Sequence, residues 1–250
     1  MFFRQLFEPE SSTYTYLLAC GETGQALLID PVVETIPRDL SVLQSLGLSL
    51  AYTLDTHIHA DHVSSACRLR NLTGCKSAYP AADGLPCADV EVAEGRPFEM
   101  GSLSILPLFT PGHTDTHHCY LLRGKEVSRV FTGDALLIDG CGRTDFQNGD
   151  TEALYHSVRQ KLFTLPDDTL VYPAHDYQHR HVSTILQERE RNPRLGDGKT
   201  LDEFAAIMAS LNLPYPKKID LAVPANRRCG DCPEEVTDRM QQVGGSSIQG

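Results

Sequence analysis

Residues 56–62 read THIHADH, which places three histidines and one aspartate within seven positions. The segment follows the β-rich run 51–55 and precedes a helical pattern at 62–72, so we expect it on the loop at the C-terminal end of a strand. Such loops carry functional groups in α/β proteins. Three imidazoles and a carboxylate packed this closely are costly to bury unless they bind a metal ion, so the segment predicts a metal site.

Three further strands are expected to end in a potential metal ligand. The motifs TPGH, TGD and YPAH follow β-rich runs and place His113, Asp134 and His175 at the strand ends. A single histidine after a strand is more often a surface residue, but four strand ends that each carry such a side chain favour one shared site. Neutral imidazole suits zinc and iron, and a carboxylate adds a hard oxygen ligand.

The rest of the chain alternates short β-rich runs with amphipathic helical patterns. Strands followed by helices, twice, indicate an α/β sandwich with two sheets face to face and helices outside, although the pattern alone also fits a doubly wound parallel sheet. A capping box, TLDE at 200–203, opens a helix whose predicted buried stripe is Leu201, Phe204, Ala205, Met208 and Leu211. The expected strands are 14–20, 25–30, 51–55, 103–109, 120–122, 129–132 and 169–172, and the other expected helices are 37–46, 62–72 and 151–163.

The charge balance excludes one class of partner. The 250 residues include 22 basic and 33 acidic side chains, and the net charge of −11 argues against nucleic acid, whose binding needs Lys and Arg to replace counterions. No apolar run approaches the ~18 residues of a membrane span, and no signal or transit peptide is seen, so we expect a cytoplasmic protein without a membrane partner. In that compartment the eight cysteines, including the C-x-x-C pair Cys229 and Cys232, are expected to be unpaired thiols.

We expect a single catalytic domain over residues 1–243. From about residue 214 the chain is rich in proline and basic residues, which predicts an irregular segment that helps to bind the substrate. The remaining residues, 244–250, read GGSSIQG and are expected to form a flexible tail.

The order of these motifs resembles a known superfamily. H-x-H-x-D-H, then G-H, then G-D, then a late histidine is typical of the metallo-β-lactamase superfamily, and the resemblance covers about residues 10–180. It implies an αββα sandwich, in which helices flank two mixed β-sheets and a metal site lies at one edge.

A narrower resemblance extends over nearly the whole chain. The start RQLFEPESSTYTYLLA, the motif TGDA, the loop GCGRTDFQ at 140–147 and the later IDLAVPAN and RCG are similar to the persulfide dioxygenases, also called sulfur dioxygenases. Members of that family use O₂ and water to oxidise glutathione persulfide to sulfite and glutathione at one non-haem Fe(II). The resemblance therefore implies a non-haem iron oxidoreductase of sulfur metabolism.

By this resemblance, the iron ligands are His57, His113 and Asp134. Two histidines and one carboxylate form the facial triad of non-haem Fe(II) oxygenases, which leaves coordination positions open. Four ligand-type residues remain, and they either orient the iron ligands or build a second metal site, as in binuclear relatives. These residues are His59, Asp61, His62 and His175.

The substrate implied by the resemblance is anionic and requires cationic partners. Arg143 is the first candidate because a guanidinium can bind a glutathione carboxylate through two parallel hydrogen bonds, although a structural salt bridge with Asp145 is an equal alternative. Asp145, Lys217 and Arg228 are further candidates for substrate binding, and Tyr177 offers a hydroxyl group. Besides glutathione persulfide and O₂, a homodimer is compatible with the resemblance.

The alternative function is that of a glyoxalase II-like hydrolase, which cleaves acylglutathione thioesters with two zinc or iron ions. It shares the fold, all seven potential ligands and the GCGR loop, whereas the TDFQ continuation and the terminal AVPANRRCG favour the dioxygenase. His117 and His118 depart from the family pattern, and we expect them to begin a strand with one face in solvent.

Overall fold

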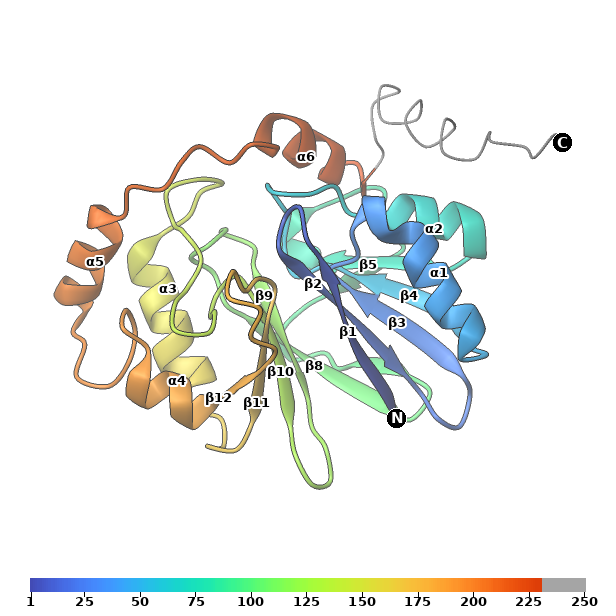
Figure 1. The fold of residues 1–250 in the computed structure, drawn as a ribbon, viewed down its shortest axis with the longest axis horizontal. Helices are drawn as coiled ribbons and strands as arrows, with labels where there is room; N and C mark the ends of the chain where they lie inside the picture. The colour runs from blue at the N-terminus through green and yellow to red at the C-terminus, as the bar shows by residue number, and fades with distance from the viewer. Residues whose placement is uncertain (231–250) are drawn as a thin grey trace, which may run out of the picture.

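The computed structural model describes residues 1–230, which form two mixed β-sheets packed face to face with helices on both outer sides (Figure 1). This arrangement confirms the predicted αββα sandwich and excludes the doubly wound single sheet. The predicted tail at 244–250 and the predicted thiol of Cys232 lie outside the described residues.

The first sheet contains six strands in chain order. Its first two pairings, β1–β2 and β2–β3, are antiparallel, and the remaining three are parallel. The strands are β1 (Phe2–Glu8), β2 (Thr13–Ala19), β3 (Gln25–Ile29), β4 (Ser49–Leu54), β5 (Lys76–Pro80) and β6 (Val90–Val92).

The second sheet also has six strands, in the order β12-β11-β10-β9-β8-β7. Only β10 and β11 run parallel. The strands are β7 (Phe98–Met100), β8 (Leu103–Phe109), β9 (His118–Leu122), β10 (Arg129–Gly133), β11 (Leu170–Pro173) and β12 (Ser183–Thr184).

Strand β2 shows why the sheets stack in this way. All seven of its side chains are buried, because successive residues of a strand point to opposite faces and both faces are covered. Tyr14, Tyr16 and Leu18 lie in the core between the sheets, where they meet Phe131 of β10. Leu17 points outward instead and packs beneath the helices of the first sheet.

Helices cover the outer face of each sheet (Figure 1). Leu43 of α1 and Leu69 of α2 pack on the first sheet. Leu154 of α3, Ile185 of α4 and Phe204 of α5 pack on the second. No helix in residues 1–230 is long and apolar enough to span a membrane. The five helices are α1 (Ile36–Ser45), α2 (Ala66–Thr73), α3 (Thr151–Ser157), α4 (Ile185–Arg191) and α5 (Leu201–Ser210).

The predicted capping box of α5 is present. Thr200 accepts a hydrogen bond from the backbone of Glu203, whose side chain accepts one from the backbone of Thr200. Within α5 only Phe204 and Met208 are fully buried, so the predicted five-residue stripe is too wide and Ala205 faces solvent. The helix predicted at 151–163 continues past α3 as a π-helical turn over Val158–Leu162.

The C-terminal segment differs from the prediction in two ways. Residues 219–226 form a helix, α6 (Ile219–Asn226), with Pro224 inside it, although the proline and basic residues from about residue 214 had predicted an irregular segment. Cys229 is not an isolated thiol: it forms a disulfide with Cys87, although the two lie 142 residues apart in sequence. The expectation of unpaired thiols rested on the inferred compartment, whereas the fold brings these two Cα atoms to 6.0 Å.

Candidate metal centre

Four loops meet at one end of the sandwich, each at the C-terminal end of a strand. His57 follows β4, His113 follows β8, Asp134 follows β10 and His175 follows β11. The structure brings the predicted triad together, because ligand atoms of His57, His113 and Asp134 all lie within 4.8 Å of one another. The three residues are buried or nearly so.

Hydrogen bonds orient two of the imidazoles. His113 donates from Nδ1 to the backbone carbonyl of Arg143 at 2.7 Å, which leaves its Nε2 atom facing Asp134 Oδ2 at 3.3 Å. His57 Nδ1 lies 2.9 Å from Thr56 Oγ1, and that hydroxyl donates in turn to Asp30. In both rings Nδ1 is engaged, which leaves Nε2 as the nitrogen available to a metal ion, and ligating histidines are usually held in this way.

The remaining ligand-type residues lie beside the triad. His59, Asp61 and His62 form a second group whose ligand atoms also lie within 4.8 Å of one another. His175 joins the two groups, because its Nε2 atom is 3.5 Å from Asp134 Oδ1 and 3.6 Å from Asp61 Oδ2. All seven predicted residues thus form one continuous cluster.

Three buried atoms of this cluster show that the side chains fit a metal ion. His59 Nδ1, His62 Nε2 and Asp134 Oδ1 have no hydrogen-bond partner among residues 1–230. A buried polar atom without a partner costs about 1–3 kcal/mol, and a cation among these atoms would remove that cost. The opposite nitrogens are engaged: His59 Nε2 lies 3.1 Å from Asp30 Oδ1, and His62 Nδ1 lies 2.9 Å from Asp61 Oδ2.

Burial controls the charge of the imidazoles. It holds the pKa of His57 well below the usual range, and the neighbouring His59 and His113 lower the pKa further, so the His57 imidazole is neutral. Burial also disfavours the charged form of His175, but the carboxylates of Asp134 and Asp61 outweigh it and raise that pKa. The raised pKa of His175 reflects the negative charge of these two neighbouring carboxylates.

A pocket of about 550 Å³ opens onto the triad. His113 and Asp134 lie on its inner wall, and Arg143, Tyr177 and Pro214 also line it. Tyr177 is 73% exposed, and its ring stacks parallel to that of His175 at 6.2 Å. Three predicted substrate-binding residues do not line this pocket: Asp145, Lys217 and Arg228. Lys217 and Arg228 are exposed on the surface.

Arg143 and Asp145 bind each other in this structure. The Arg143 guanidinium donates two hydrogen bonds to the Asp145 carboxylate, at 2.6 and 2.8 Å, and a third to the carbonyl of Pro214. It also lies over the ring of Phe146, 4.5 Å from the centroid. The salt bridge that was an alternative to substrate binding is thus present, and it lies at the pocket rim.

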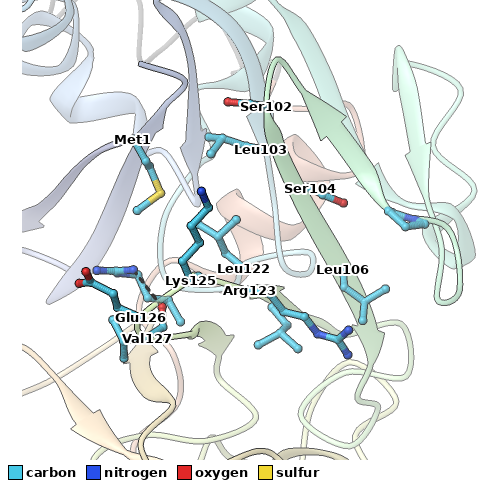
Figure 2. Close-up of a pocket in the computed structure, with 14 residues that line it drawn as sticks. Met1, Ser102, Leu103, Ser104, Leu106, Leu122, Arg123, Lys125, Glu126 and Val127 are labelled. Atoms are coloured by element: carbon cyan, nitrogen blue, oxygen red, sulfur yellow. Dashed lines mark hydrogen bonds between the residues drawn. The ribbon is translucent and has the colours of Figure 1, made fainter. Parts of the chain in front are cut away.

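Figure 2 shows the residues that line a second hollow, of about 620 Å³. Leu103 at the start of β8 and Leu122 at the end of β9 line it, so it is at the opposite end of the second sheet. Its polar groups include Arg123, Lys125 and Glu126 on an exposed turn. These residues do not form a cluster of metal-ligating side chains, and the triad pocket remains the candidate site.

His117 and His118 are both buried, which corrects the expectation of a solvated face. Strand β9 does begin at His118, as predicted. No pattern in the sequence predicted that His117 Nε2 accepts a hydrogen bond from the backbone amide of Asp134 or that His117 Nδ1 lies 3.0 Å from Thr110 Oγ1. Asp30 was also missed; an aspartate directly after a buried strand was the available signal.

Comparison with known proteins identifies the superfamily to which the chain belongs. A family model described as the metallo-beta-lactamase superfamily matches residues 9–175 of this chain. Within that class, human persulfide dioxygenase ETHE1, mitochondrial, is 50% identical over 228 residues, which cover 91% of this chain and 88% of the human protein. The crystal structure of ETHE1 from Myxococcus xanthus matches with a TM-score of 0.88 and 53% identity, covering 92% of this chain and 100% of that one. The chain therefore belongs to the persulfide dioxygenase family.

The hydrolase relatives are more distant. Hydroxyacylglutathione hydrolase of Polaromonas sp. is 35% identical over 182 residues, which cover 72% of this chain and 68% of the hydrolase. Both the identity and the coverage are lower than for the dioxygenases, so these comparisons favour the predicted function over its alternative.

Proposed function

We propose that the chain oxidises glutathione persulfide with O₂ and water to sulfite and glutathione, using one Fe(II) held by His57, His113 and Asp134. The main support for the proposal is geometric: ligand atoms of two imidazoles and one carboxylate lie within 4.8 Å of one another, and two of these three residues, His113 and Asp134, line a pocket. Half of the sequence is identical to that of persulfide dioxygenases over nearly the whole chain. Two histidines and a carboxylate are the ligand set of non-haem Fe(II) oxygenases.

Bound iron would supply open coordination positions and the redox chemistry that O₂ requires. The residues of the chain orient the two proposed histidine ligands. The carbonyl of Arg143 fixes the tautomer of His113, and Thr56 with Asp30 fixes that of His57. His59, Asp61, His62 and His175 would act as neighbours that tune these ligands and hold water, in a cluster compatible with a second metal.

The pocket rim suits the charges of glutathione. Glutathione carries carboxylates and one ammonium group, and Arg143 and Asp145 offer one group of each opposite sign. Tyr177 is exposed beside His175 and can donate its hydroxyl to the substrate. Lys217 and Arg228 stay in the proposal only as more distant surface charges that attract an anion.

Replacing Arg143 with alanine should raise the KM for glutathione persulfide about tenfold, because a charge-assisted hydrogen bond to a carboxylate is lost. The kcat and the iron content should stay near those of the wild type, because His113 bonds to the backbone of Arg143 and not to its side chain. Steady-state O₂ uptake and metal analysis measure both quantities. Arg123→Ala is the matched control, since Arg123 lies at the other pocket. An unchanged KM, or lost iron, contradicts the substrate role.

A paired assay tests the function itself. Iron-loaded protein should consume O₂ with glutathione persulfide and should leave an acylglutathione thioester intact, with about one iron per chain. Two observations keep the hydrolase as the second candidate: the seven-residue cluster and the relatives named hydroxyacylglutathione hydrolase. Thioester cleavage with about two metal ions per chain and no O₂ uptake would replace the proposal with that alternative.

We also propose that the partners of the site are small molecules, with no nucleic acid and no membrane. A cytoplasmic location and a homodimer remain predictions. Light scattering on the purified protein measures the subunit number, and separation of cell fractions locates the chain.

A further inference from the structure

The side chain of Asn226, the final residue of α6, lies against the backbone of the THIHADH loop. Its Nδ2 donates to the carbonyls of His59 and His62, each at 2.9 Å. Its Oδ1 accepts from the backbone amide of Ser64 at 2.8 Å. The side chain is 1% exposed, so water does not compete for these three hydrogen bonds. Asn226 belongs to the AVPAN motif, which the proposed chemistry does not use.

Three further contacts hold the end of α6 in place. Cys229 is bonded to Cys87 through the disulfide, and its carbonyl accepts a hydrogen bond from the amide of Cys67 in α2. Gly230 lies so close to the loop that a Cβ atom there would be 1.9 Å from the carbonyl oxygen of Ser64. Its φ of +81° also requires glycine. Asn226 therefore approaches the loop from a fixed support.

The loop needs such a support because it is irregular and buried. The carbonyls of His59 and His62 belong to the stretch that carries the HxHxDH side chains, and neither lies in a strand or helix. A buried carbonyl requires a donor, and one carboxamide supplies two donors and one acceptor in a single plane. Gln147 makes a similar contact with the same loop, because its Nε2 donates to the carbonyl of Ile58 at 2.7 Å.

We propose that Asn226 is a positioning residue of the metal centre: it fixes the backbone of residues 59–64, and so the direction in which the HxHxDH side chains point. The role in iron binding rests on the proposed function. The role in ordering the loop does not. Both of the late motifs that distinguish this chain from the hydrolases, TDFQ and AVPAN, thus contribute an amide side chain that binds the backbone of one loop.

Two variants of Asn226 test the proposal. Asn226→Ala removes all three hydrogen bonds, and Asn226→Asp keeps the shape and the acceptor for Ser64 but loses both donors. In each variant we expect iron affinity and kcat to fall about tenfold or more, with KM changed much less, because partners that orient ligands usually have effects of this size. The nitric oxide adduct of the Fe(II) protein should also change its electron paramagnetic resonance spectrum, which reports ligand geometry.

Hydrogen exchange measures the loop without reference to iron or activity. In wild-type protein the Ser64 amide should be protected, and in both variants peptides spanning 57–64 should exchange at least about tenfold faster. Phe204→Leu is the control, since it weakens the outer core at α5 without touching the loop. It should lower the melting temperature while leaving loop exchange, iron affinity and kcat unchanged.

Several results would overturn the proposal. An unprotected Ser64 amide in wild-type protein would do so even if neither variant folds. Unchanged loop exchange and iron affinity in a folded Asn226→Ala protein would do so as well. If instead the wild-type protein shows no O₂ uptake but the variants loosen the loop as expected, the proposed function fails while the positioning role stands.

Discussion

Replacing Asp134 with asparagine should lower persulfide-dependent O₂ uptake by about 1000-fold, because losing the charged ligand of a catalytic metal costs several kcal/mol and ~4 kcal/mol corresponds to that factor. Asparagine has the same shape, so packing is preserved. Asp134 Oδ2 lies 3.3 Å from His113 Nε2, and Oδ1 has no hydrogen-bond partner among the described residues. The carboxylate is thus positioned for a cation, and bound iron should fall together with activity.

Asp168→Asn is the matched control, because Asp168 is an exposed carboxylate outside the pocket. This control should keep wild-type iron content and O₂ uptake. Circular dichroism and thermal unfolding of both variants show whether the fold is kept. A folded Asp134→Asn protein with full iron content and near-normal kcat would remove Asp134 from the ligand set, and the facial-triad assignment would then fail.

The convergence of the site was predictable from the sequence because it depends on strand ends. His113, Asp134 and His175 each follow a β-rich run by a few residues, and the strands expected at those places exist as β8, β10 and β11. Side chains just beyond neighbouring strand ends must lie close together once the strands pair. The sequence pattern therefore predicted which side chains come together, although it did not predict the number of metal ions.

Long-range partners were not predictable. Cys87 and Cys229 are joined across 142 residues, and no local pattern marks such a pair. The hydrogen bonds from Asn226 to the loop at 59–64 likewise depend on where α6 packs. The helix itself was not predicted, because Pro224 lies inside it and proline is unusual in a helix interior. Strand β1 was missed because its exposed residues dilute the alternation that identifies a strand.

Gly142 is the second position where a small change should have a large effect. A Cβ atom there would lie 2.5 Å from the carbonyl oxygen of Asp134, 2.8 Å from His113 Nδ1 and 2.9 Å from Asp134 Cβ. Real Cβ atoms almost never approach other heavy atoms to within 3.0 Å, so Gly142→Ala must displace one or both proposed ligands. Because a 1 Å misplacement of catalytic groups can cost about 100-fold, we expect a loss of that order in kcat.

The same loop offers a close control. Gly140 lies two residues earlier, and a Cβ atom there would meet nothing nearer than 3.9 Å, so Gly140→Ala should keep wild-type kcat and iron content. Gly142→Ala should also bind iron more weakly, because the amide of Gly142 donates to the carbonyl of Asp134 at 2.7 Å and moves with it. Steady-state O₂ uptake and iron titration of the two variants test this difference. Equal kcat values in two folded variants would show that the ligands tolerate the displacement, and the triad would then not require the close packing seen here.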